Sequence, residues 1–258
     1  MKLKLLFLCI LVMNSFSFIK KSFHNQLSLR TKKTKSFVVP KKNNFYDPKT
    51  LNQEKYICHV NDPKIKLIIG MGSAGSGKTL LACQSAVKGL LDGENDKIII
   101  TRPVVPVEED LGFLPGTINK KMDPWTRPLM DIFNEFHSKS NIKGMLKENT
   151  IEISPLGFMR GRTFKNAFII ADEMQNSSPT QMLMLLTRIG DNSKLVITGD
   201  LKQSDKDWSG LEDLLQKLKV SYENEEKMIQ DGIAIIEFNE EDVQRSPLVK
   251  KILKIYSK

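Results

Sequence analysis

The sequence predicts an α/β fold with three α/β/α layers around a mostly parallel sheet. Segments with strand and helix character alternate from about residue 45 onward, which is typical of a parallel sheet. The strand segments are apolar throughout, as in Ile98-Ile99-Ile100, and this composition is expected when helices cover both faces of a sheet. A glycine-rich turn at Gly72–Gly77 joins the first strand to the next helix.

Each predicted element follows from its local sequence. The first helix is expected to begin after Thr50, because a hydroxyl side chain suits an N-cap. Apolar residues at helical spacing, as in Leu211, Leu214 and Leu218, indicate the later helices. The stretch Arg102–Asp123 holds three prolines and two glycines, so we expect a structured loop or lid there. The predicted strands are Lys66–Gly70, Lys97–Thr101, Thr150–Ser154, Ala167–Ala171, Lys194–Thr198 and Ile233–Phe238. The other predicted helices are Lys78–Leu91, Pro124–Ser138, Pro179–Ile189, Gly210–Leu218 and Pro247–Tyr256.

The segment Gly72–Thr79 fits the phosphate-binding pattern G-x-x-x-x-G-K-[ST] at every fixed position. Glycines let successive backbone N–H groups turn inward, and the N-terminus of the following helix adds the positive end of its dipole. Lys78 is predicted to reach the β- and γ-phosphates of a nucleotide, and the Thr79 hydroxyl to hold Mg²⁺. A glycine-rich turn without a ligand is the alternative. The other residues predicted to bind the nucleotide here are Gly72, Ser73, Ala74, Gly75, Ser76 and Gly77.

Polar side chains follow two further strands at the point where each strand ends. Asp172 and Glu173 come directly after one apolar strand, at the carboxyl edge where sites in α/β sheets are built. We expect Asp172 to contact the Mg²⁺ shell and Glu173 to orient or polarise the attacking water. Asp200 and Gln203 follow another strand and could sense the γ-phosphate. The alternatives are solvated acids in the first case and a capped turn in the second.

The positive charge belongs to the N-terminal segment. The formal net charge is +9, but residues 1–46 hold ten Lys or Arg and no Asp or Glu. The remainder therefore has 39 − 10 = 29 basic residues against 30 acidic ones, a net charge of −1. Net charge thus gives no argument for a nucleic-acid partner, although a local basic face could exist. The three cysteines show no disulfide or metal-ligand spacing.

Residues 1–44 are predicted to be a targeting leader, and residues 45–258 the folded domain. Lys2 and Lys4 precede an apolar run of signal-peptide length, Leu5–Met13, which is too short to span a bilayer as a helix. The acid-free segment that follows has the composition of a transit peptide. Together they resemble the bipartite leader of proteins sent to plastids with extra membranes, so a plastid location without stable membrane insertion of the mature domain is expected. A secretory signal, a lone membrane anchor or a cytoplasmic location are the alternatives.

The ordered motifs of the chain resemble the PhoH family of ATPases, which is similar to the first RecA-like core of superfamily 1 helicases. The resemblance runs from about Asn52 to Tyr256 and implies a P-loop NTPase with a RecA-like sheet, ATP as substrate and Mg²⁺ as cofactor. The segments that carry it are Gly72–Thr79, Thr101–Val105, Leu111–Gly116, Asp123–Leu129, Met159–Thr163, Asp172–Asn176, Leu186–Gly190, Thr198–Asp200 with Gln203, and Asp242–Leu248.

The resemblance also implies roles outside the glycine loop. Gln53 stands where related ATPases place a glutamine that reads adenine. Arg245 stands where an arginine could neutralise the γ-phosphate of the same or a neighbouring subunit, a role worth about 10³–10⁵ in rate where such arginines exist. The next residue is Ser246, where the family usually has histidine, and this leaves any proton-sensitive role there in doubt. Candidates for RNA phosphates or subunit contacts, with structural pairing to acids as the alternative, are Arg102, Arg160, Arg162 and Arg188.

The site residues and the resemblance predict a Mg²⁺-dependent ATP hydrolase. The resemblance alone implies coupling to remodelling of RNA or a ribonucleoprotein, with single-stranded RNA as a partner. Unwinding by superfamily 1 enzymes uses two cores and this chain has room for one, so we expect a homo-oligomer, most simply a ring. The alternative is an ATP-dependent switch or scaffold with little turnover. A P-loop small-molecule kinase is disfavoured by the Asp172-Glu173 pair, which suits water activation. Gln53 and the absence of an N-K-x-D motif favour ATP over GTP.

Overall fold

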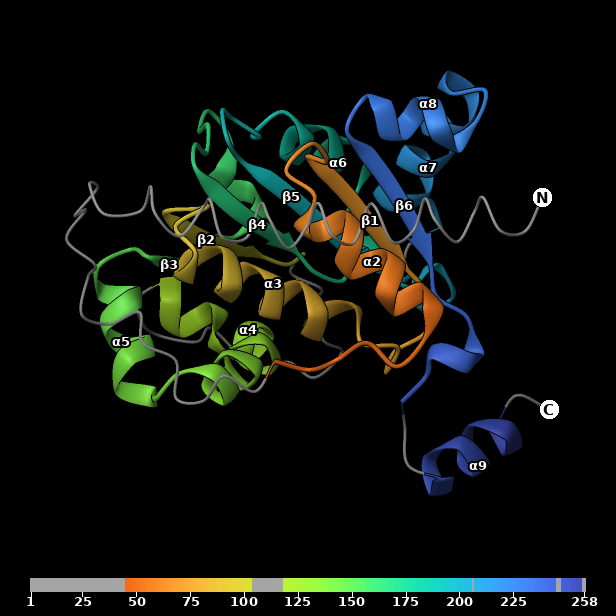
Figure 1. The fold of residues 1–258 in the computed structure, drawn as a ribbon, viewed down its shortest axis with the longest axis horizontal. Coiled ribbons are helices and arrows are strands. Elements are labelled where there is room, and N and C mark those ends of the chain that lie inside the picture. The colour runs from red at the N-terminus through yellow and green to blue at the C-terminus, as the bar shows by residue number, and fades with distance from the viewer. Residues whose placement is uncertain (1–44, 104–117, 206, 245–246, 257–258) are drawn as a thin grey trace, which may run out of the picture. The chain divides into compact units, whose positions relative to one another are not determined.

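The core of the molecule is a parallel sheet with the strand order β3-β2-β4-β5-β1-β6 (Figure 1). The structure is a computed structural model that describes residues 45–103, 118–205, 207–244 and 247–256. Every strand pair within the described residues is parallel, so the predicted α/β class is confirmed. The strands are β1 (Leu67–Met71), β2 (Lys97–Thr101), β3 (Ile151–Ile153), β4 (Ala167–Ala171), β5 (Lys194–Gly199) and β6 (Ile233–Glu237).

The helices begin where the sequence offers capping side chains. Thr50 accepts a hydrogen bond from the Gln53 backbone and starts α2, as predicted. Ser178 and Gln181 form a capping box at the start of α6. The α-helices are α2 (Leu51–Asn61), α3 (Lys78–Leu91), α4 (Ile118–Phe136), α5 (Lys139–Lys147), α6 (Pro179–Leu186), α7 (Gly210–Ser221), α8 (Glu225–Gln230) and α9 (Pro247–Tyr256). Short 3₁₀ turns are η1 (Leu156–Met159), η2 (Met174–Asn176), η3 (Leu201–Gln203) and η4 (Glu240–Asp242).

Helices cover both faces of the sheet and make the three layers. α2, α3 and α4 lie on one face, while α6 and α7 pack together against the other (Figure 1). Successive strand residues point to opposite faces, so a central strand must be apolar at every position. Ile98, Ile99 and Ile100 are accordingly fully buried. The core thus explains why the strand segments read as unbroken apolar runs.

Three elements differ from the prediction. Pro124 suggested a helix start because proline suits the first helical turn, but α4 begins at Ile118 and contains this proline. The helices α5 and α8 were not predicted, because each is short and largely polar. Their clearest signals are the N-caps Ser138 and Asn224, which accept hydrogen bonds from Asn141 N and Lys227 N.

The strand order places the ends of four strands side by side at the carboxyl edge of the sheet. β2, β4, β5 and β1 are consecutive neighbours, and the predicted site residues follow β4, β5 and β1. Backbone hydrogen bonds extend beyond the strands, from Asp172 N to Thr101 O at 3.0 Å and from Gly72 N to Gly199 O at 3.1 Å. The fold therefore gathers these segments at the carboxyl edge.

Some predictions fall on residues that the structure does not describe. The leader at residues 1–44, Arg245, Ser246 and most of the expected loop Arg102–Asp123 lie outside the described residues. In the part of the chain that the structure does describe, no helix has both the length and the apolar character needed to cross a membrane.

Candidate nucleotide-binding site

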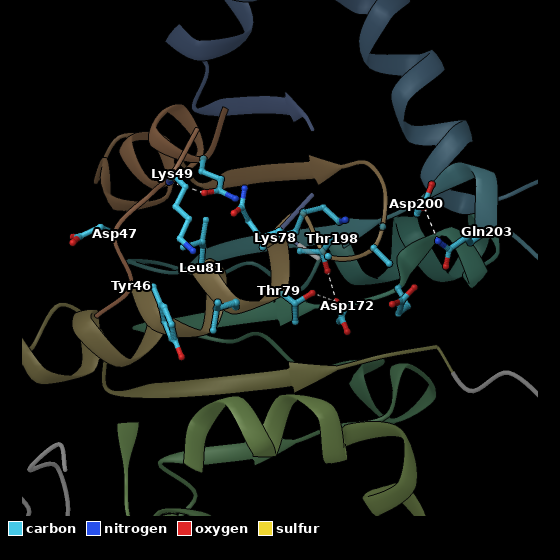
Figure 2. A pocket seen from close by; sticks show the side chains of 18 residues that line it. Tyr46, Asp47, Lys49, Lys78, Thr79, Leu81, Asp172, Thr198, Asp200 and Gln203 are labelled. Carbon is cyan, nitrogen blue, oxygen red and sulfur yellow. Dashed lines mark hydrogen bonds between the residues drawn. The ribbon is translucent and has the colours of Figure 1, made fainter. Parts of the chain in front are cut away.

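A cavity of about 480 Å³ opens at the carboxyl edge of the sheet (Figure 2). Its volume lies in the range of small-molecule sites, about 300–1,000 Å³. Figure 2 shows Lys78, Thr79 and Asp172 near its middle, with Tyr46 to one side and Asp200 to the other. The lining residues are Tyr46, Asp47, Lys49, Gln53, Ala74, Gly75, Gly77, Lys78, Thr79, Leu80, Leu81, Asp172, Glu173, Thr198, Gly199, Asp200, Gln203 and Gln244.

The glycine loop has the backbone that its sequence requires. Gly72, Gly75 and Gly77 have φ values of 134°, 89° and 91°, in the region that L side chains rarely adopt. A Cβ on Gly72 would lie 2.3 Å from the Phe238 carbonyl oxygen, so this position also needs glycine for close approach to the end of β6. Gly77 precedes α3 and has no side chain to cap the helix, which leaves the N-terminal N–H groups for an anion.

Lys78 lies inside the loop, where phosphates are expected. Its side chain is 8% exposed, and its ammonium donates to the carbonyl oxygens of Gly72 and Ser73 and to the Ser76 hydroxyl. The contacts to Ser73 and Ser76 measure 2.9 and 3.1 Å. Phosphate oxygens are charged and make stronger acceptors than carbonyls. The ammonium is therefore positioned to exchange loop oxygens for those of a nucleotide.

The hydroxyl of Thr79 meets the carboxylate of Asp172. Thr79 Oγ1 donates to Asp172 Oδ1 at 2.8 Å, and Thr198 Oγ1 donates to the same oxygen from the end of β5. Asp172 is 5% exposed. A hydroxyl and a carboxylate oxygen are the hard ligands that Mg²⁺ prefers, and Mg²⁺ usually completes its shell with water and substrate phosphates. The donor set of Thr79 and Asp172 therefore fits this ion. Within the described residues, no group of three or more His, Cys, Asp or Glu side chains forms another metal-ligand cluster.

Glu173 adopts a backbone conformation that is uncommon for a residue with a side chain. Its φ is 55°, in the left-handed region, and such residues gather at functional sites. Its Oε1 lies 3.4 Å from Arg102 Nη2, and its Oε2 accepts a 2.6 Å hydrogen bond from Gln175 Nε2. Both carboxylate oxygens thus have a protein donor.

Asp200 and Gln203 form a pair at the far side of the cavity from Tyr46 (Figure 2). Gln203 Nε2 donates to Asp200 Oδ2 at 2.8 Å, and the backbone of Asp200 donates to Gln175 Oε1 at 3.1 Å. Asp200 also caps η3 through a bond from Lys202 N. Asp200 therefore lines the cavity and also caps a turn, and its role at a γ-phosphate stays a prediction.

Gln53 braces the glycine loop through its carboxamide. The side chain is 4% exposed, accepts from Lys49 N at 2.8 Å and donates to Ser76 O at 2.9 Å and to Asp242 O at 3.4 Å. Burial opposes ionisation of Asp242, but hydrogen bonds from Asn52, Thr50 and the Asn239 backbone outweigh it and lower the pKa of that carboxyl. Gln53 lines the cavity, and its adenine-reading role stays a prediction.

The sequence did not single out several residues that build the site. Tyr46 and Lys49 line the cavity. The backbone N–H of Tyr46 donates to Gln84 Oε1 at 2.6 Å, and Gln84 Nε2 donates to the Tyr46 carbonyl at 2.9 Å. Gln244 reaches the loop through a 2.9 Å bond from its N–H to Gly75 O. Gln175 links Glu173 to the end of β5. The contacts of Tyr46 and Gln244 join segments far apart in the chain.

Two of the four candidate arginines have structural roles. Arg162 makes a two-point ion pair with Glu152, one contact of which measures 2.9 Å, and its guanidinium lies 4.6 Å from the centre of the Phe164 ring. Arg188 donates to Arg162 O at 2.9 Å and to a carbonyl of α6. Arg160 is exposed, while Arg102 faces Glu173.

The comparisons with known proteins identify the family of this chain. The family model for PhoH-like proteins matches residues 46–257. The chain belongs to this family. A PhoH-like protein from Bacillus subtilis is 42% identical over 212 residues, covering 81% of this chain and 63% of that protein. Protein PhoH from Escherichia coli K12 is 40% identical over 197 residues, covering 74% of this chain and 53% of that protein.

This member of the PhoH-like family thus spans less than two thirds of the length of these relatives. Among solved structures, the large terminase from a thermophilic bacteriophage is similar at 16% identity with a TM-score of 0.48, over 80% of this chain and 48% of that one.

Proposed function

We propose that this domain binds ATP together with Mg²⁺ and hydrolyses it. The observation that carries the proposal is the 2.8 Å contact between Thr79 and Asp172. It brings the phosphate loop after β1 and the acid after β4 to one point, although 93 positions separate the two residues. A glycine-rich turn without a ligand does not require a carboxylate beside it, so this contact favours a binding site.

Each side chain has a distinct task in the proposed reaction. The loop N–H groups and Lys78 bind the phosphates and offset their charge, while Thr79 and Asp172 hold the metal ion. Bound Mg²⁺ supplies a positive charge that stabilises the phosphate oxygens as the bond breaks.

Glu173 is the proposed proton acceptor for the attacking water. The water oxygen forms a bond to the γ-phosphorus, the bond from this phosphorus to the β–γ bridging oxygen breaks, and ADP leaves. The proton lost by the water moves to the Glu173 carboxylate.

We propose in addition that turnover is coupled to single-stranded RNA and that several copies of the chain assemble. Support for assembly comes from α9, whose exposed apolar residues Leu248, Ile252 and Ile255 recur at helical spacing along one face. The Gln244 bond to Gly75 holds the segment before α9 against the phosphate loop. Arg245 is the next residue in the sequence and lies outside the described residues, and its role at a γ-phosphate is part of this proposal. The leader at residues 1–44 is proposed to direct the domain to a plastid.

A switch with little turnover is the second candidate. It is favoured by the contacts of Glu173, since both oxygens of the proposed proton acceptor already have protein donors. Hydrolysis and this alternative differ in whether free phosphate appears.

The test is Mg²⁺-dependent phosphate release from ATP by the chain and by Thr79→Val. The variant keeps the side-chain shape but loses the hydroxyl ligand, so we expect a higher Mg²⁺ requirement and a kcat/KM at least about tenfold lower, the effect of 1.4 kcal/mol. Thr187→Val is the matched control, because Thr187 lies exposed at the end of α6 and its hydroxyl bonds, among the residues that the structure describes, carbonyls of α6 and Arg188.

No phosphate release at any Mg²⁺ concentration would favour the switch. Equal activities of Thr79→Val and Thr187→Val would contradict the site itself. Titrating poly(U) RNA into the wild-type assay tests the coupling, with a rise in kcat as the expected result.

A further inference from the structure

Glu173 is held by two donors, Arg102 from the end of the neighbouring strand β2 and Gln175 from the turn after β4 itself. Arg102 follows β2, and its Nη2 lies 3.4 Å from Glu173 Oε1. Gln175 donates to the other oxygen at 2.6 Å, and its own Oε1 accepts from the Asp200 backbone at the end of β5. The carboxylate therefore connects to the ends of both strands that neighbour β4.

The sheet order gives these two contacts different directions. β4 lies between β2 and β5, and β1 with its phosphate loop lies beyond β5. The ion pair with Arg102 thus ties one carboxylate oxygen to the β2 side of β4, the side opposite β1. The bond from Gln175 anchors it toward the end of β5, beside the loop.

We propose that Arg102 is a positioning residue that holds Glu173 away from the attacking water, and that an RNA phosphate releases Glu173 by pairing with Arg102. The inference rests on the hydrolysis and on the coupling to single-stranded RNA proposed above. With Arg102 paired elsewhere, Glu173 keeps its bond to Gln175 and gains a free oxygen for a proton from water. RNA binding then raises kcat without a new catalytic group.

The exposure of the pair makes the exchange feasible. The side chain of Arg102 is 23% exposed and that of Glu173 is 37% exposed, so solvent and ions can approach the contact. Ion pairs of this kind are weak, whereas a guanidinium can bind a phosphate through two parallel hydrogen bonds. Arg162 is not available for the same exchange without losing its two-point pair with Glu152.

The test compares Arg102→Gln with the wild-type chain in steady-state ATP hydrolysis, without and with poly(U) RNA. Arg102→Gln removes the charge that holds Glu173. We expect its kcat without RNA to rise about 1.5- to 5-fold, the range that partly exposed ion pairs supply, with little change in KM. We also expect RNA to stimulate the variant much less than the wild type.

Two further variants separate positioning from other effects. Arg102→Lys keeps a positive charge and should return the RNA-free kcat toward the wild-type value, which also covers the case in which Arg102→Gln folds poorly. Lys165→Gln removes the same charge from an exposed pair with Asp191 at 3.0 Å, and should leave both activities unchanged.

An RNA-free kcat of Arg102→Gln equal to or below wild type, with RNA stimulation intact, would overturn the inference and leave the proposed hydrolysis standing. If the wild-type chain releases no phosphate under any condition, the proposed hydrolysis fails and the inference fails with it. A rise of kcat in Arg102→Gln that Lys165→Gln reproduces would assign the effect to net charge and overturn the positioning role.

Discussion

Replacing Thr198 by valine tests how Asp172 is held. Thr198 is 1% exposed, and its hydroxyl donates to the oxygen of Asp172 that also accepts from Thr79. Valine has nearly the same shape, so the substitution removes one hydrogen bond and little packing. The Asp172 carboxylate loses one of the two donors that fix its orientation at the metal position.

The magnitude follows from the charge of the acceptor. A hydrogen bond to an ionised group contributes about 1.5–3 kcal/mol net. If all of it is lost in the transition state, kcat/KM falls about 10- to 150-fold, and any part that is lost before ATP binds appears as a lower free energy of unfolding. Steady-state ATP hydrolysis and urea unfolding of Thr198→Val measure the two parts.

Thr101→Val is the matched control on the neighbouring strand. Thr101 is also fully buried at a strand end, but its hydroxyl has no hydrogen-bond partner among the described residues. Removing an unpaired buried hydroxyl should leave the free energy of unfolding unchanged or raise it. Equal losses in Thr198→Val and Thr101→Val, in both assays, would refute the argument that the Thr198 hydroxyl positions Asp172.

Three further predictions concern the loop and the opposite edge of the sheet. Lys78→Ala should abolish phosphate release, because the positive charge at the β- and γ-phosphates is lost; retained turnover would contradict the assignment. Gly72→Ala should lower the free energy of unfolding by more than about 1–3 kcal/mol, since its Cβ would add a 2.3 Å contact with Phe238 O to the backbone strain. Gly157→Ala is its control, with nothing within 4 Å of the added Cβ and an expected change below about 0.5 kcal/mol in urea unfolding. Burial, and then a neighbouring lysine, lower the pKa of Lys194 to about 8 from 10.5. Between pH 8 and 10.5 Lys194 is more protonated in the unfolded chain than in the folded one. This group therefore makes the free energy of unfolding rise with pH in that range. NMR titration of the lysine side chains should show one transition near pH 8 that is missing in Lys194→Met; a Lys194 transition above pH 10 would contradict the prediction.

The sequence could predict the sheet and the centre of the site because both depend on short local patterns. The apolar run Ile98–Ile100 requires two covered faces, and Gly72–Thr79 between a strand and a helix requires a phosphate cradle. Asp172 could be placed beside the loop because it directly follows a strand, and parallel strands end at one edge.

The parts that escaped prediction depend on contacts between distant segments. Tyr46 reaches the cavity through contacts with distant residues, among them the bonds between its backbone and Gln84, 38 positions along the chain. Arg102 and Glu173 were each expected after a strand, but their ion pair depends on the strand order and on side-chain geometry that no sequence pattern reports. The helices α5 and α8 were not predicted, because short polar helices have a weak periodicity of apolar residues.

The most direct test of the account is ATP binding and hydrolysis by Glu173→Gln. The substitution keeps the size of the side chain and removes its capacity to accept a proton at pH 7. We expect ATP and Mg²⁺ to bind with nearly wild-type affinity, because Lys78, Thr79 and Asp172 are unchanged. Phosphate release should slow about 10²- to 10⁴-fold, the contribution of a positioned general base. Hydrolysis at the wild-type rate by this variant would contradict the central claim that Glu173 activates water at this site.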